Sequence, residues 1–139
     1  MFLEMLKKEQ KELFLQLAVI ATEANGKVEE NEKEMLIKFA NEMNVEPIDK
    51  ADKSFDDIIN ELASISDKRE KKIILFETVG IMNSDGDFDV KETEFLSKIA
   101  AKFEINNEIL EDMMYLVTTY IDLFDAIIGT VLEDEEENE

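Results

Sequence analysis

Apolar residues recur along most of this chain at intervals of three and four positions, the spacing of one face of an α-helix. Such periods cover about residues 3–24, 29–43, 55–62, 66–81, 89–103 and 106–132. Pro occurs once and Gly only four times, so few residues would end a helix. The pattern therefore predicts an all-α protein of about six helices.

Two predicted helical hairpins repeat each other 60 residues apart, over about 10–45 and 70–105. Leu13 and Leu36 in the first correspond to Ile73 and Leu96 in the second. Because each hairpin has an apolar face, we expect the two to pack about a pseudo-twofold axis, linked by the third helix and covered by the last. The length predicts a single domain over 1–132, followed by a disordered acidic tail at 133–139.

The long C-terminal helix, expected from about Asn106 to Leu132, has an apolar stripe that is too wide for one face. Its members include Ile109, Leu110, Met113, Leu116, Val117, Tyr120, Phe124, Ile127 and Ile128. Such a helix is either central to the fold or also contacts another chain. The methionines of the chain are expected mainly in the core.

The net charge of −20 excludes several classes of partner. A surface this acidic repels nucleic-acid phosphates and anionic lipid headgroups. The chain has no Cys and no His, so disulfides and zinc or copper sites are not expected. No uncharged stretch approaches the ~20 residues of a membrane helix, and no signal peptide is evident. We therefore expect a cytoplasmic protein without direct membrane insertion or nucleic-acid binding.

An acidic turn between the helices of the second hairpin is the main candidate site. Carboxylate and amide oxygens are the ligands of calcium, magnesium and manganese. The candidate metal ligands are Asn83, Asp85, Asp87, Asp89 and Glu92. The turn fits a calcium loop only partly: with Asn83 first, Phe88 takes the place of the required Gly, and with Gly86 sixth, Ile81 takes the first ligand position.

A structural reading of the same turn competes with the metal site. Asp89 and Glu92 have the spacing of a capping box, which needs no metal. The corresponding turn of the first hairpin contains Lys27, which opposes cation binding. Asp85 and Asp87 form a pair of carboxylates, but they lie on a turn expected to be exposed, with no His or Cys to assist them. The sequence therefore predicts a protein that is not an enzyme.

The duplicated pattern of an apolar helix, a turn with Gly and acids, and a second apolar helix resembles the TerB-like tellurite-resistance family. It is carried by residues 17–32, which read Leu-Ala-Val-Ile-Ala-Thr-Glu-Ala-Asn-Gly-Lys-Val-Glu-Glu-Asn-Glu, and by 85–92, Asp-Gly-Asp-Phe-Asp-Val-Lys-Glu. The pattern covers about residues 10–130 and also resembles the N-terminal domain of some DnaJ-like co-chaperones.

The resemblance implies a non-enzymatic, cytoplasmic helical protein of metal or stress responses, in which an acidic turn binds a divalent cation weakly. It also implies a protein partner, which can be membrane-embedded, while the acidic tail suits a basic one. A homo-oligomer is a further option. The alternative function is a protein-interaction or scaffold module whose acidic turns only cap helices.

Overall fold

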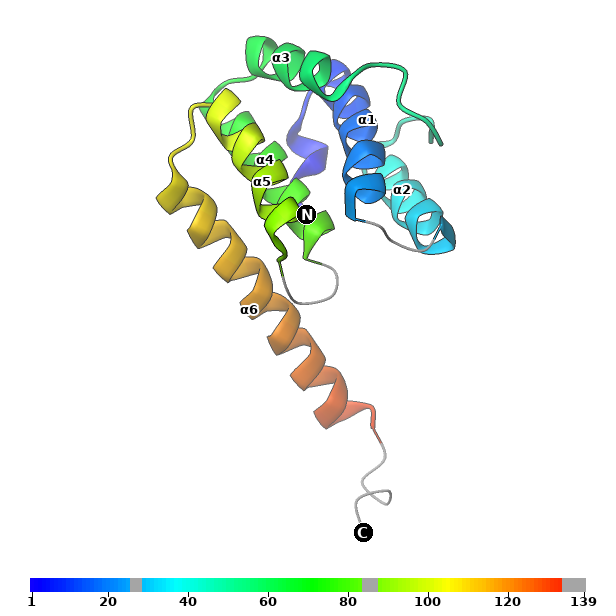
Figure 1. Cartoon of the computed structure of the whole chain (residues 1–139). Helices are drawn as coiled ribbons and strands as arrows, with labels where there is room; N and C mark the ends of the chain where they lie inside the picture. Colours follow the sequence, from blue (N-terminus) through cyan, green and yellow to red (C-terminus); the bar gives the residue numbers. More distant parts are fainter. Residues whose placement is uncertain (26–28, 84–87, 134–139) are drawn as a thin grey trace.

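The computed structural model shows an all-helical protein, as the periodicity predicts, and describes residues 1–25, 29–83 and 88–133. Within these residues there are six α-helices, one short 3₁₀-helix and no strand (Figure 1). The elements are η1 (Leu3–Met5), α1 (Lys8–Asn25), α2 (Glu29–Met43), α3 (Phe55–Ile65), α4 (Lys68–Met82), α5 (Val90–Lys102) and α6 (Asn107–Val131). The sequence therefore predicted the number and order of the α-helices correctly.

The first predicted helix is interrupted near its start. Leu6 has an extended backbone and separates η1 from α1. The backbone N–H of Lys7 then donates to Oε1 of Gln10 at 2.7 Å, which satisfies one of the donors that the start of α1 leaves open. The break turns Leu3 and Leu6 into the core, where both are buried. A continuous helical period could not reveal a turn that depends on this buried glutamine.

The two hairpins retain matching structures at equivalent positions. Shortly after the last residue of α2 and of α5 comes a residue with a φ of 57°, Asn44 in the first hairpin and Glu104 in the second. In each, the next residue donates its N–H to the carbonyl oxygen five residues back, from Val45 to Ala40 at 3.0 Å and from Ile105 to Ala100 at 2.9 Å. This is the Schellman arrangement, which ends a helix by satisfying its last carbonyls. Its recurrence at an offset of 60 supports a duplicated unit.

Helices α1 and α4 lie at the centre of the core and pack against each other. Phe14 and Leu17 of α1 and Ile74 and Val79 of α4 have no exposed surface. The short helix α3 packs on α1 and α5, and so joins the two hairpins. Met43 and Met82 are buried in the same core, which agrees with the predicted place of the methionines.

Four helices begin at residues that the sequence marks as caps. Ser54, Asp67, Asp89 and Asn106 each accept a hydrogen bond from the backbone N–H three residues later, at 2.7–3.1 Å. These bonds satisfy donors that the first helical turn would leave open. Capping is a local property, so the starts of these helices follow directly from the chain.

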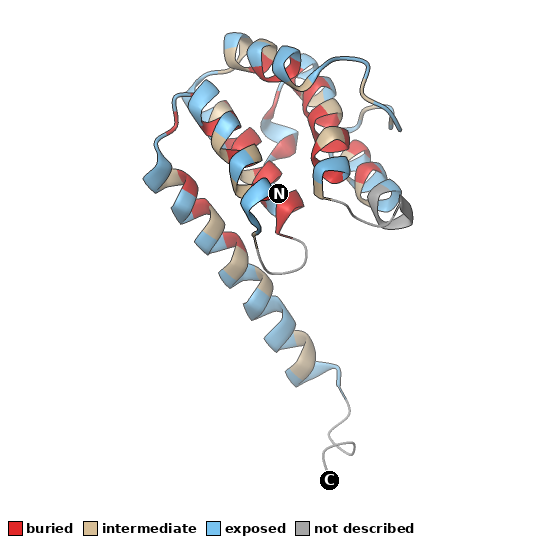
Figure 2. Cartoon of the chain, in the orientation of Figure 1, coloured by how far each residue is buried: buried red, intermediate tan, exposed pale blue. Residues whose placement is uncertain are grey.

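Helix α6 does not cover both hairpins, and this part of the predicted architecture is wrong. Its main contacts are with α4 and α5, so it lies on the second hairpin. Figure 1 shows that it runs beside α5 and then extends past the end of the hairpins. Figure 2 shows buried residues on its first half and mainly exposed ones on its second half. Helix α6 is therefore not central to the fold, and the predicted alternative, contact with another chain, stays a prediction.

Candidate functional site

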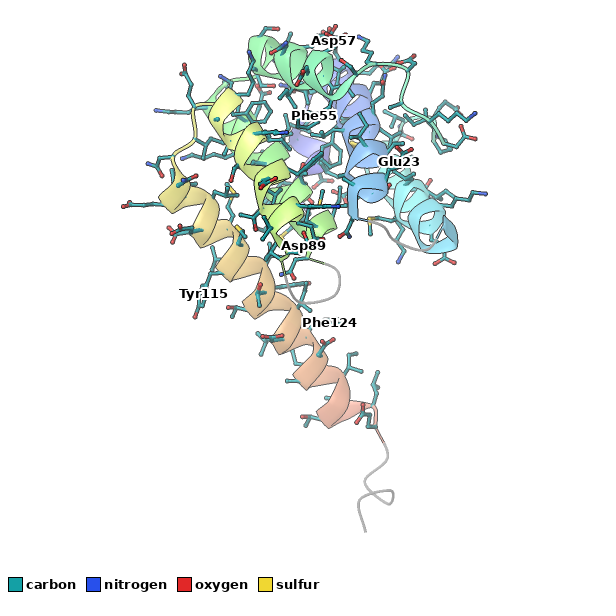
Figure 3. All side chains as sticks on the ribbon, in the orientation of Figure 1. Glu23, Phe55, Asp57, Asp89, Tyr115 and Phe124 are labelled. Carbon is teal, nitrogen blue, oxygen red and sulfur yellow. The ribbon has the colours of Figure 1, made fainter. Side chains whose placement is uncertain are left out.

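The second acidic turn connects α4 to α5, and the structure describes three of its five predicted metal ligands. Asn83 ends α4, and Asp89 and Glu92 begin α5. Asp85 and Asp87 lie outside the described residues. Figure 3 shows Asp89 at the end of α5 that adjoins the turn.

The two described carboxylates of this turn hold the start of α5. Oδ1 of Asp89 accepts from the N–H of Glu92 at 2.7 Å, and Oε1 of Glu92 accepts from the N–H of Asp89 at 2.9 Å. This reciprocal pair is the capping box predicted from the spacing, and it is confirmed. An equivalent box, formed by Asp67 and Glu70, begins α4, where no acidic turn is present. The acidic residues at the start of α5 thus have a structural role of their own.

Asn83 faces α6. Its side chain is fully buried, and Nδ2 donates to Oγ1 of Thr118 at 2.7 Å. The oxygen of this amide, Oδ1, has no hydrogen-bond partner among the residues that the structure describes. An unpaired buried oxygen of this kind destabilises a fold by about 1–3 kcal/mol unless a ligand or a water satisfies it. The side chain therefore ties the end of α4 to the middle of α6 and leaves one acceptor open.

The structure does not bring further acidic groups to this turn. Among the residues that it describes, no three acidic side chains lie close enough together to hold a metal ion. In the first hairpin, Nδ2 of Asn25 donates to the carbonyl oxygen of Ile81 at 3.3 Å, so the end of α1 contacts the end of α4. Lys27 lies outside the described residues. The helix ends that lead into the two turns therefore lie side by side.

A groove of about 720 Å³ lies between α1, α2 and the segment that follows α2. Its apolar lining includes Val19, Leu36 and Ile48, and both acidic and basic side chains stand at its rim. Neither Cys nor His occurs in the chain to act as a nucleophile or general base there. The groove offers shape and apolar surface, without a recognisable set of reactive groups.

The most extensive unusual feature is an apolar strip on α6, which we call the α6 apolar face. Each of its six side chains is between 50% and 68% exposed. The face consists of Leu116, Tyr120, Leu123, Phe124, Ile127 and Val131. Figure 3 shows Phe124 on the part of α6 that extends beyond the end of α5. The rings of Tyr120 and Phe124 stack with their centroids 6.5 Å apart, so they form one continuous aromatic surface.

The buried contacts of α6 come from its first half only. Leu110, Met113 and Val117 are buried against the second hairpin. Beyond Thr118, Ile121, Ile128 and Gly129 are half-buried, and the other residues up to Val131 are exposed. Of the helices described, α6 alone is long and apolar enough to cross a membrane by length and composition. The sequence pattern predicted a wide apolar stripe, but it did not distinguish the first half of α6, which packs on the second hairpin and which we call the seated half, from the exposed second half.

Comparison with known proteins finds no matching family model, no matching curated protein and no matching solved structure.

Proposed function

We propose that this chain is a non-catalytic helical interaction module, of TerB-like architecture, that binds a partner protein through the α6 apolar face. The exposure of that face is the observation that carries the proposal. Contiguous exposed apolar patches on monomeric proteins seldom exceed a few hundred Å², and larger ones mark interaction sites. Six large apolar side chains, all at least half exposed, follow one another along about four turns of a single helix.

The stability of the exposed half of α6 supports the same function. A helix of about 12–15 residues is only marginally stable in water without packing partners. Residues 119–131 are a segment of this size, with little burial against the rest of the chain. A partner that covers the α6 apolar face would supply the missing packing. The seated half, in turn, would hold the binding segment in a fixed direction.

The capping role of Asp89 and Glu92 fits an interaction module with structural turns. Both carboxylates stabilise the start of α5, so the turn needs no metal to explain their presence. Because the chain resembles the TerB-like family, we also propose that the protein is cytoplasmic and acts in metal or stress responses together with a protein partner. The partner of such a module can itself be embedded in a membrane.

Site-specific photo-crosslinking tests the binding surface. A photoreactive residue replaces Leu123 on the α6 apolar face or, as a matched control, Asp125, which is exposed on the opposite side of the same segment. In living cells we expect a discrete adduct from position 123 and none from position 125. Equal labelling from both positions, or no adduct from either in cells that express the chain normally, would contradict the proposed interaction.

A second candidate function is weak binding of a divalent cation at the second acidic turn. The observation that favours it is the buried Oδ1 of Asn83, an oxygen at the start of the turn that has no partner among the described residues. Asp85 and Asp87 would supply the charge, with Asp89 and Glu92 at the far end of the turn. Calcium, magnesium and manganese are the cations whose preferences match these oxygens.

Calorimetric titration with each of the three cations tests this second function. The wild type is compared with Asp85→Ala and with a control, Asp49→Ala, in a segment remote in sequence from the turn. Binding should raise the free energy of unfolding by about 2.7 kcal/mol at a hundredfold excess over Kd, and only Asp85→Ala should remove the gain. No heat and no thermal shift at millimolar cation would rule out the site.

A further inference from the structure

We infer that the occupant of the α6 apolar face is a basic amphipathic helix of another protein, with an apolar stripe flanked by Lys or Arg. This inference rests on the proposed function and adds the chemistry of the partner. It follows from the spacing of the exposed side chains, from the charge around them, and from the poor fit of the two other occupants, a second copy and a lipid surface.

The spacing of the face is that of a helix which packs on another helix. Tyr120, Phe124, Ile127 and Val131 follow one another at intervals of four, three and four residues. Such intervals place side chains in one row along a helix, which is how amphipathic helices present their anchors. Leu116 and Leu123 widen the row on one side. A second helix with its own apolar stripe can interdigitate with this row along its whole length.

The charge around the face is of one sign. No Lys or Arg follows Lys102, whereas residues 103–139 contain twelve acids. Asp122 and Asp125 lie within the exposed half of α6, on the side of the helix away from the α6 apolar face, and the chain after Leu132 is almost wholly acidic. Complementary charge across an interface favours the correct partner and speeds its association, while like charges suppress the wrong one. The partner surface that satisfies this condition carries bases beside its apolar stripe.

A second copy of the chain does not meet that condition. Pairing through the α6 apolar face would bring together two chains of net charge −20, and neither α6 nor the residues after it contain a base that could pair with an acid of the other copy. Like charges brought together in an association disfavour it. Electrostatic repulsion between two copies therefore offsets part of the binding free energy that their apolar contacts would contribute.

A lipid surface fits poorly as well. Asp122 and Asp125 lie in the middle of the apolar part of α6, and an Asp at the centre of a membrane helix strongly disfavours insertion. Helices that lie in the membrane interface carry Lys and Arg on their polar face, which α6 lacks. Anionic headgroups repel the acids that precede and follow the α6 apolar face. A basic amphipathic helix of another protein complements both the apolar row of α6 and the acidic charge of this part of the chain.

Fluorescence anisotropy with three synthetic peptides tests the inference. The first is an 18-residue amphipathic helix of Leu and Lys, the second carries Glu in place of Lys, and the third has the first composition in a scrambled order without an apolar stripe. The whole chain should bind the Leu/Lys helix at least tenfold more tightly than either control peptide. Raising the NaCl concentration from 50 to 300 mM should weaken that binding severalfold, because the charges are exposed.

Variants of the chain separate the apolar and charged contributions. Phe124→Ser should lower the affinity for the Leu/Lys helix about tenfold, while Ala126→Ser on the same segment should leave it unchanged. Asp122→Lys combined with Asp125→Lys should weaken binding and reduce its salt dependence, whereas Glu9→Lys on α1 should change neither. Circular dichroism of each variant verifies that it remains folded.

Four outcomes would overturn the inference. These are equal binding of the Leu/Glu helix, equal binding of the scrambled peptide, a dimer in sedimentation that Phe124→Ser abolishes, and uptake by vesicles of phosphatidylcholine or phosphatidylserine that the same variant abolishes. The crosslink at position 123 distinguishes these failures from failure of the proposed function. If the crosslinked adduct forms but the Asp122→Lys, Asp125→Lys variant binds the Leu/Lys helix as the wild type does, the chain is still an interaction module and its partner is not basic.

Discussion

The two halves of α6 have similar composition but opposite environments. In the first half, Leu110 and Val117 are buried against the second hairpin, whereas in the second half Leu123 and Ile127 are at least half exposed. Both halves repeat apolar residues at helical spacing. The difference between them comes from the length of α4 and α5, which end before α6 does. Apolar periodicity therefore indicates that a surface will be covered, without indicating whether the same chain covers it.

Truncation of one leucine in each half is the strongest test of this comparison. Leu110→Ala should lower the free energy of unfolding by about 2–5 kcal/mol, because it removes buried methyl groups and leaves a cavity. Leu123→Ala should change it by less than about 0.5 kcal/mol, because the side chain is exposed in the free chain and Ala is a better helix former. Urea unfolding followed by circular dichroism measures both. Equal losses would show that the second half of α6 packs on the body.

The hydrogen bond between Asn83 and Thr118 marks the boundary between the two halves. Thr118→Val keeps the shape of the side chain but removes the acceptor of Nδ2 of Asn83, which is fully buried. We expect a loss of about 1–3 kcal/mol in the free energy of unfolding, since a buried donor is left unpaired. Thr119→Val is the matched control on the exposed side, expected within about 0.5 kcal/mol of wild type. Similar free energies of unfolding for the two variants would show that this hydrogen bond does not hold α6 against the second hairpin.

A smaller change, just before α6, should stabilise the seated half. Glu104 has a φ of 57°, a left-handed conformation that Gly adopts without strain. Glu104→Gly should therefore raise the melting temperature by the equivalent of about 0.5–1 kcal/mol. The equivalent change Asn44→Gly should give less, because Asn tolerates this conformation better than Glu does. Thermal unfolding of the pair of variants measures the difference, and a larger gain at position 44 would contradict it.

The smallest expected effect is a pH dependence of the free energy of unfolding that comes from the two hairpins and the N-terminus, and not from α6. Burial by itself lowers the pKa of the Met1 amino group, but its hydrogen bonds to Glu77 and Glu42 outweigh burial and raise that pKa above its usual 8.0. A raised pKa in the folded state stabilises the fold below the unfolded pKa, and the stabilisation is lost as the pH rises through the folded value. The amine lies 3.0 Å from Glu77 and 3.1 Å from Glu42, on the body rather than on α6.

Melting temperatures between pH 7 and pH 10 measure this loss. Acetylation of the N-terminus removes the titrating amine, so the acetylated chain should lack this part of the pH dependence while keeping its helical content. Identical pH profiles for the two forms would show that the contacts of the amine do not stabilise the fold.

The capping box at the start of α5 was predictable because Asp89 and Glu92 lie three residues apart, so residue type and spacing were sufficient. The fourth helix was expected from residue 66, whereas the cap of α4 is Asp67, one residue later. The repeat was predictable because both copies kept the same apolar positions. The break after η1 was missed because it depends on Gln10, whose side chain also bonds to Ser66, 56 positions along the chain.

For the candidate site, the sequence indicated the chemistry of each side chain but not its neighbours. It identified Asn83 as an oxygen ligand, while the fold turned the amide of Asn83 toward Thr118, 35 positions away in sequence. It also predicted that Asp89 and Glu92 would cap α5, which the structure confirms. Whether Asp85 and Asp87 act with them on a cation stays a prediction, because these two residues lie outside the described part of the turn.

The sequence by itself determined the all-α class, the order of the helices, their capped starts and the acidic, apolar character of α6. These properties depend on residues a few positions apart, whose contacts form in any chain with that local order. Only the tertiary structure decided which apolar residues of α6 are buried and which remain exposed. Burial depends on whether another element lies alongside, and α4 and α5 extend only far enough to cover the first half of α6.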